Sequence, residues 1–191
     1  MKKLLLTLFI LAVAPGALPQ VALPAHPYIK FETTEGDIVV ELDGRRAPIT
    51  VANFLGLVDD SYFDGTVFHR VMPDFMIQGG GYTPGLRLKE PGDYIFNESG
   101  NGLTNMRGTI AMARQQDPHT AKAQFFINVK DNPSLEPQRD RWGYAVFGYV
   151  IEGMDVVDKI ANVRTGPQGQ FSKNVPIVPI VIKKAARFEF E

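Results

Sequence analysis

The sequence predicts one mostly β domain: a closed eight-stranded antiparallel β-barrel capped by two α-helices. About eight segments have the pattern of strands, and only two have the pattern of helices. The strands mostly follow one another through loops and not through helices, which is typical of antiparallel sheets. Thirteen Phe residues with scattered Val and Ile favour a β-rich core. The length of 191 residues suggests a single domain without internal repeats.

The first 25 residues have the order of a secretory signal peptide, which leaves residues 26–191 as the predicted domain. Lys2-Lys3 gives a short positive region, and Leu4–Ala14 is an apolar run too short to span a bilayer. An uncleaved anchor or a buried helix would be the alternatives. Small residues after the run allow cleavage after Ala17, Ala22 or Ala25.

The first part of the domain predicts a β-hairpin followed by a helix. Residues 28–33 and 37–42 alternate between apolar and polar side chains, and Glu35-Gly36 between them is a turn signal. Pro48 is tolerated in the first turn of a helix. The apolar stripe of that helix has the spacing i, i+3, i+4, i+7 and consists of Val51, Phe54, Leu55 and Val58.

Residues 68–81 stand out because they combine two short strands, a turn and three glycines. Phe68, Arg70 and Met72 are expected on one strand face, because side chains alternate along a strand. Burying the Arg70 guanidinium among apolar residues is costly unless it is hydrogen-bonded. The alternative is an arginine at a sheet edge that extends to water. The glycines at 79–81 indicate a bend or a close approach to the backbone.

The rest of the chain predicts four more strands and the second helix. Strands are expected at 108–113, 123–129, 143–150 and 177–188, and the helix at 153–161. Residues 82–102, 114–122 and 131–141 are polar and rich in turn residues, so they should be loops. On the strand 123–129, Gln124, Phe126 and Asn128 share a face.

Several classes of function lack the residues that they need. The net charge of −1 gives no basic excess for nucleic acid. The absence of cysteine excludes thiol catalysis and disulfides. No metal-ligand spacing or Gly-x-Ser-x-Gly motif occurs, and the glycine run lacks the Lys-Ser/Thr of a phosphate loop. We therefore expect no metal or cofactor, and a surface of Phe, Met, Ala and Gln with one arginine. Such a surface suits an extended apolar peptide, or a reaction without proton transfer.

Residues 68–80, Phe-His-Arg-Val-Met-Pro-Asp-Phe-Met-Ile-Gln-Gly-Gly, resemble the signature of the cyclophilins, which are peptidyl-prolyl cis–trans isomerases. Further family-like pieces occur in order at 108–113, 124–127, 146–148 and 152–154, so the resemblance runs from Tyr28 to Phe188. With its leader, the chain is most similar to the periplasmic cyclophilins of Gram-negative bacteria. The resemblance implies the same barrel with two helices, a periplasmic location and isomerase activity.

The resemblance also implies roles for individual residues. Arg70 matches the catalytic arginine, and Gln78 matches the glutamine that hydrogen-bonds the substrate backbone. Ala113 and Gln124 match residues that hold the peptide before the proline. Tyr144 stands where many members have histidine. The walls of the proline pocket correspond to Phe75, Met76, Phe126 and Leu135.

Three departures from the family pattern affect the expected partners. Ser134 stands where eukaryotic members have a tryptophan that contacts cyclosporin, so weak cyclosporin binding is expected. Arg114 stands where many members have asparagine, and the loop 114–122 is one residue longer than the commonest form. Trp142 is shifted from the usual tryptophan position. The implied partners are proline-containing segments of unfolded or folding proteins, without nucleic acid or, once the leader is removed, a membrane. We expect a monomer.

A mechanism follows from the bond that such an enzyme turns. Amide resonance gives the X–Pro bond a rotation barrier of roughly 18–20 kcal/mol. At the twisted transition state the proline nitrogen regains a lone pair, to which Arg70 could donate a hydrogen bond. A proline-peptide receptor with little catalysis is the competing hypothesis, and a hydrolase is a third.

Overall fold

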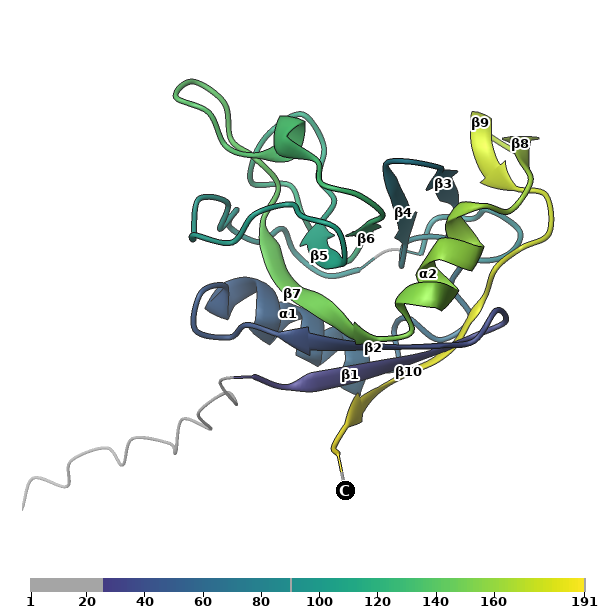
Figure 1. Cartoon of the computed structure of the whole chain (residues 1–191), viewed down its shortest axis with the longest axis horizontal. Coiled ribbons are helices and arrows are strands. Elements are labelled where there is room, and N and C mark those ends of the chain that lie inside the picture. The colour runs from purple at the N-terminus through teal and green to yellow at the C-terminus, as the bar shows by residue number, and fades with distance from the viewer. Residues whose placement is uncertain (1–25, 90, 191) are drawn as a thin grey trace, which may run out of the picture.

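The computed structural model describes residues 26–89 and 91–190, which form the predicted mostly β architecture with two α-helices (Figure 1). The predicted leader lies outside the described residues. Within them, no helix has the length and apolar character needed to cross a membrane. The helices are α1 (Pro48–Asp59), α2 (Met154–Ala161) and a 3-10 turn, η1 (Pro133–Leu135). The strands are β1 (Tyr28–Thr33), β2 (Asp37–Leu42), β3 (Arg70–Met72), β4 (Met76–Gly79), β5 (Thr109–Met112), β6 (Phe125–Asn128), β7 (Val146–Glu152), β8 (Thr165–Gln168), β9 (Phe171–Pro176) and β10 (Ile182–Phe188).

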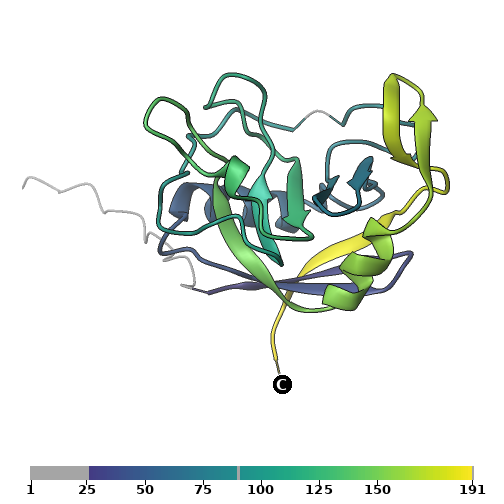
Figure 2. The ribbon, with the colours of Figure 1, turned by 45° about the horizontal axis from the view of Figure 1, so that its top comes forward.

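Eight of these strands form one antiparallel sheet in the order β10-β1-β2-β7-β5-β6-β4-β3. The sheet curls around the core (Figures 1 and 2). In the described residues no ladder joins its edge strands, β3 and β10. The segments before these strands meet at a single bridge, Val67–Val181, where the Phe68 N–H donates to the Ile180 carbonyl at 3.0 Å. The sheet is therefore a curled half-barrel, and the continuous closure that the sequence predicted is not shown.

A second sheet, the hairpin of β8 and β9, was not predicted. The sequence predicted one strand from residue 177 to 188, whereas β9 ends at Pro176 and β10 begins at Ile182. Pro179 lies in the break between them, where it disrupts no ladder. The hairpin stands next to β3 (Figure 2), and β9 contacts that strand.

The main core is built around interlocked phenylalanines. The rings of Phe54 and Phe63 lie 4.8 Å apart, and those of Phe31 and Phe125 lie 5.3 Å apart. Offset and edge-to-face contacts of this kind add stability beyond the burial of area. The predicted stripe of α1 contributes to this core, as its spacing requires. The phenylalanines among the largest fully buried side chains are Phe31, Phe54, Phe63, Phe68, Phe125 and Phe147.

The N-terminus of α1 is capped by a residue from a distant loop. Ala47 makes no side-chain cap, so the first backbone N–H groups of the helix need other acceptors. Glu98 provides them: its Oε1 accepts from the Ile49 N–H at 3.0 Å, and its Oε2 accepts from the Thr50 N–H at 2.8 Å. A carboxylate at this end also complements the helix dipole. The long loop after residue 82 is thereby attached to the helix.

The helix α2 begins directly after Gly153, which has φ +83°. A Cβ on this residue would lie 2.2 Å from the Asp37 carbonyl oxygen of β2, so only glycine fits. This close approach seats α2 against β2, and the helix also contacts β3 and β4.

His69, which directly precedes β3 in the chain, is buried. Its ring packs against Tyr82 at 4.5 Å and Phe171 of β9 at 5.6 Å. Burial lowers the pKa of His69 from 6.5 to about 4, with a further lowering by the Arg70 charge, although a hydrogen bond to the Val67 backbone acts the other way. The imidazole is therefore neutral at physiological pH.

This burial predicts an acid-sensitive free energy of unfolding. The unfolded chain binds a proton at His69 near pH 6.5, whereas the folded chain does so only near pH 4. Stability is thus complete above pH 6.5 and is lost as the pH falls toward 4, by about 3 kcal/mol from this residue. Urea unfolding of the parent and of His69→Gln between pH 7.5 and 4 measures the loss. An equal pH dependence in both proteins would contradict the assignment.

Candidate functional site

The register of four antiparallel strand pairs aligns a row of residues across the sheet. Arg70 of β3 lies opposite Gln78 of β4, and Gln78 lies opposite Phe126 of β6. Phe126 in turn lies opposite Ala111 of β5, which lies opposite Val146 of β7. Opposed residues present their side chains on the same face. One face of the sheet therefore carries, in order across the strands from β3 to β7, a charged group, an amide and an apolar surface.

The polar end of this row is a chain of hydrogen bonds between side chains. Arg70 Nη1 donates to Gln78 Oε1 at 3.2 Å, and Gln78 Nε2 donates to Gln124 Oε1 at 3.1 Å. The three side chains are partly exposed. The structure thus brings together the predicted catalytic arginine and the two predicted glutamines.

The Arg70 guanidinium is half-buried and is not paired with a carboxylate in the described part of the chain. Burial lowers the pKa of Arg70 below its ordinary value, and an electrostatic effect of Tyr144 partly opposes this. An arginine keeps its charge even so. Since Gln78 is its one acceptor among the described residues, other N–H groups remain available to a ligand.

The apolar end of the row is a second hydrophobic cluster, separate from the main core. All six predicted apolar and aromatic ligand-binding residues belong to it: Phe75, Met76, Ala113, Phe126, Leu135 and Tyr144. The Phe126 and Tyr144 rings meet edge to face at 5.7 Å. Sequence reasoning did not assign Met72, Leu103, Ala111 and Val146 to this site, although they complete the cluster.

The predicted position of Phe68 was wrong. The sequence placed it on the same face as Arg70 and Met72, but β3 begins only at Arg70. Phe68 lies in the main core, 6.1 Å from the Phe125 ring. The alternation of side chains does not extend back through residues 68 and 69, because they are not part of the strand.

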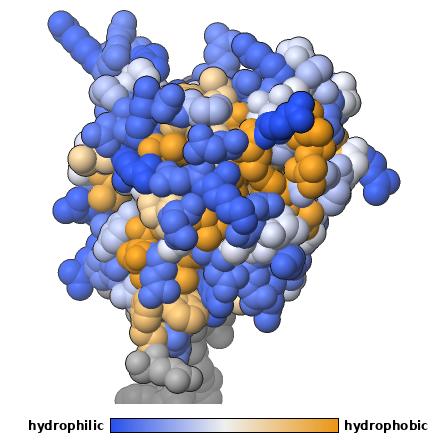
Figure 3. Space-filling view, turned by 45° about the vertical axis from the view of Figure 1, so that its right-hand side comes forward, coloured by the Kyte–Doolittle hydropathy of each residue, from blue (hydrophilic) through white to orange (hydrophobic). Residues whose placement is uncertain are grey.

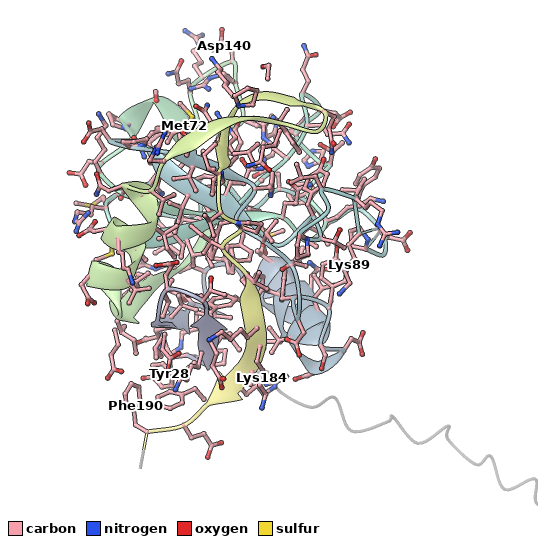
Figure 4. All side chains as sticks on the ribbon, turned by 90° about the vertical axis from the view of Figure 1, so that its right-hand side faces the viewer. Tyr28, Met72, Lys89, Asp140, Lys184 and Phe190 are labelled. Atoms are coloured by element: carbon pink, nitrogen blue, oxygen red, sulfur yellow. The ribbon has the colours of Figure 1, made fainter. Side chains whose placement is uncertain are left out.

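The site lies at the end of the molecule away from Tyr28 and Phe190, near the two ends of the described chain (Figure 4). Met72 and Asp140 are near this end, whereas Tyr28 and Phe190 are at the other (Figure 4). On the face drawn in Figure 3, apolar residues reach the surface in patches between hydrophilic side chains.

Arg114, one of the departures from the family pattern, forms hydrogen bonds to the backbone of another loop of the same chain. Its Nε donates to the Gly143 carbonyl at 3.1 Å and its Nη2 donates to the Trp142 carbonyl at 2.7 Å. Its guanidinium lies 4.7 Å from the centre of the Tyr144 ring. Arg114 therefore fastens its loop to the segment that carries Tyr144. Ser134, the other departure, is exposed on η1.

A cavity of about 360 Å³ adjoins the two glutamines. Gly81 forms part of its wall, and a Cβ there would lie 2.4 Å from Gln124 Cγ. The third glycine of the run is thus required by the side chain of Gln124. In the described residues, no group of three His, Cys, Asp or Glu side chains is placed to hold a metal ion.

The Gly81 contact predicts a selective loss of ligand binding. In Gly81→Ala the new methyl group displaces the flexible Gln124 side chain and breaks its bond to Gln78, but the backbone fold is kept. Since the resemblance assigns Gln124 to holding a peptide, we expect the affinity for a proline-containing peptide to fall roughly tenfold, measured by calorimetric titration. The control is Gly56→Ala, because Gly56 is a helical glycine with open space around it. Equal peptide affinities in the two variants would refute the role of this contact.

Comparisons with known proteins agree with this geometry. The family model for the cyclophilin type peptidyl-prolyl cis-trans isomerase matches residues 28–183. A peptidyl-prolyl cis-trans isomerase of Streptomyces antibioticus is 52% identical, covering 82% of this chain and 96% of the relative. Isomerase B of Escherichia coli is 49% identical over 81% of this chain and 96% of that protein.

A solved structure shows the same fold. The cyclophilin of Cryptosporidium parvum, crystallised in the presence of the dipeptide Ala-Pro, has a TM-score of 0.72 and 29% sequence identity. The match covers 85% of this chain and 99% of that chain. Together with its arginine, glutamines and apolar cluster, these matches show that the chain belongs to the cyclophilin-type peptidyl-prolyl cis–trans isomerases.

Proposed function

We propose that Arg70 accelerates rotation about X–Pro bonds by donating a hydrogen bond to the proline nitrogen in the twisted transition state. The observation that carries this proposal is the half-buried guanidinium, which has free donors and borders an apolar cluster. In the planar ground state the nitrogen lone pair is part of the amide resonance and accepts poorly. The bond therefore strengthens as the peptide twists, which is the condition for catalysis.

The apolar cluster would hold the proline ring while the preceding carbonyl swings. Phe75, Met76, Phe126 and Leu135 form the walls, and Tyr144 borders them. The crystallisation of the Cryptosporidium relative with Ala-Pro supports a proline-containing ligand. Gln78 would hydrogen-bond the substrate backbone, and Ala113 with Gln124 would hold the peptide before the proline.

This mechanism needs neither a covalent intermediate between enzyme and substrate nor a base that takes up a proton. A tenfold acceleration corresponds to about 1.4 kcal/mol of transition-state stabilisation. A charge-assisted hydrogen bond in a partly desolvated site is worth more than one in water. Arg70 is therefore suited to provide a large part of the rate enhancement by itself.

We assign this activity to unfolded or folding secreted proteins in the periplasm, with the chain acting as a monomer. The leader-like order of residues 1–25 supports export, because a positive region precedes an apolar run and small residues. Weak cyclosporin binding is part of the proposal, since Ser134 offers no aromatic surface on η1.

A proline-peptide receptor with little catalysis would use the same cluster. That alternative gives no reason for an arginine with free donors beside the ring pocket, because apolar walls suffice for binding. A hydrolase would need a nucleophile and a base. Ser134, on η1, is exposed and none of the three histidines belongs to the apolar cluster.

Substitution of Arg70 tests the proposal. Arg70→Ala should lower kcat/KM for an Ala-Pro peptide roughly 100-fold, since one preorganised donor is lost. Arg70→Lys should lose at least about tenfold, because an ammonium lacks the planar fork of donors. A protease-coupled isomerisation assay gives both values. The control is Arg187→Ala, which removes a surface arginine paired with Asp59 at 2.7 Å. A loss of only a few-fold in Arg70→Lys would contradict the mechanism.

The export proposal has its own test. The full chain is expressed in a Gram-negative host, and the mass of the recovered protein is determined. We expect recovery from the periplasmic fraction with a new N-terminus after Ala17, Ala22 or Ala25. Recovery of the uncleaved chain from the cytoplasm would overturn the assignment.

A further inference from the structure

Three asparagines are buried next to the apolar cluster. Asn105, Asn128 and Asn132 are exposed by only 2%, 0% and 3%. A buried amide costs free energy unless its donors and acceptors are satisfied. Burying three amides together therefore costs free energy that apolar side chains would not cost. Their hydrogen-bond partners indicate the structural role of the three residues.

The three amides donate to one another in a single direction. Asn132 Nδ2 donates to Asn128 Oδ1 at 2.7 Å, and Asn128 Nδ2 donates to Asn105 Oδ1 at 3.3 Å. Asn105 Nδ2 then donates to Glu136 Oε1 at 3.2 Å, and the Asn105 backbone N–H donates to the same oxygen. Hydrogen bonds in such a chain polarise one another, and here they end on a carboxylate.

The same asparagines hold the backbone of three pocket walls. Asn132 Nδ2 donates to the Phe75 carbonyl at 2.9 Å, and the backbone carbonyl of Asn132 accepts from the Leu135 N–H at 3.0 Å. Asn105 Nδ2 lies 3.5 Å from the Tyr144 carbonyl, as a second acceptor. Phe75 ends the turn between β3 and β4, Leu135 ends η1, and Tyr144 precedes β7. The amides thus contact the Phe75 and Tyr144 segments directly, and the backbone of Asn132 connects them to Leu135.

We propose that the chain Asn132–Asn128–Asn105–Glu136 positions the walls of the proline pocket. The proposal rests on the proposed role of that pocket in binding substrate. None of the four residues belongs to the apolar cluster, so they act as positioning residues through Phe75, Leu135 and Tyr144.

This role predicts a specific kinetic signature. The walls hold the proline ring in both the ground state and the transition state, so loosening them weakens binding uniformly. Uniform weakening raises KM and leaves kcat unchanged. General destabilisation instead lowers the folded fraction, which reduces the apparent kcat without changing KM.

The test is Asn132→Leu, which keeps the side-chain size but removes both donors. We expect KM for an Ala-Pro peptide to rise about tenfold with kcat within about twofold of the parent. The control is Thr33→Val. It removes the hydroxyl of a buried residue in the β1–β2 hairpin, and with it the hydrogen bond of 2.6 Å that Thr33 Oγ1 donates to the Gly36 carbonyl. Thr33→Val should lower the unfolding midpoint and leave KM unchanged. An unchanged KM in Asn132→Leu would overturn the proposal.

Glu136 keeps the proposal testable should Asn132→Leu fail to fold, because this residue is only partly buried. Glu136→Leu removes the acceptor of the chain and should raise KM, whereas Glu136→Gln retains an acceptor oxygen and should restore most of the affinity. Equal KM values in these two variants and the parent would also refute the proposal.

A parent protein without isomerase activity would contradict the proposed function, but the positioning proposal could still be judged. Calorimetric titration of the same peptide then replaces KM. Weaker binding by Asn132→Leu and Glu136→Leu than by the parent and Thr33→Val would support the positioning role. Equal affinities of all four proteins for the peptide would refute the positioning proposal.

Discussion

The antiparallel register of β3, β4, β6 and β5 is the constraint on which the site depends. It sets Arg70 opposite Gln78, Gln78 opposite Phe126, and Phe126 opposite Ala111. A slip of one residue in any pair would turn one set of side chains to the other face of the sheet. The polar and apolar halves of the site are therefore neighbours because of backbone pairing, and no single side-chain contact accounts for them.

The positive charge at the edge of this row, that of Arg70, has a neutral hydrogen-bond partner. Arg70 is half-buried but is held by the neutral amide of Gln78, and no carboxylate in the described residues pairs with it. A carboxylate partner would neutralise the guanidinium in the resting protein and could occupy two of its donors. The amide leaves other Arg70 donors free, and the proposed mechanism uses these donors at the transition state. The chain, a peptidyl-prolyl isomerase, would thus keep an incompletely satisfied charge next to an apolar pocket.

Periodicity in the sequence predicted the two helices and the mostly antiparallel sheet. The candidate site residues came from the resemblance to the cyclophilins. The structure places six of them in one apolar cluster and joins Arg70 to the two glutamines by hydrogen bonds. The β8–β9 hairpin was missed because residues 165–176 lack alternating apolar side chains and contain Gly166 and Pro167. The place of Phe68 was wrong because a strand boundary, which depends on tertiary pairing, falls between it and Arg70.

The asparagine chain could not be predicted, because Asn105 lies 23 residues before Asn128 in the sequence and asparagine is common in loops. Only Asn128 carried a signal, by sharing a strand face with Gln124 and Phe126. The attachment of Arg114 to residues 142 and 143 likewise joins two loops whose approach is set by the folded chain. Export, monomeric state and the individual roles of the site residues remain proposals.

In the proposed mechanism, Arg70 acts on the transition state and contributes little to binding. Exchange NMR on an Ala-Pro peptide saturated with enzyme measures the cis–trans interconversion rate of the bound peptide, and titration in the same samples gives its affinity. We expect Arg70→Ala to bind the peptide nearly as well as the parent but to lose the rapid interconversion. A variant that loses affinity while the bound peptide still interconverts at the parental rate would contradict the mechanism.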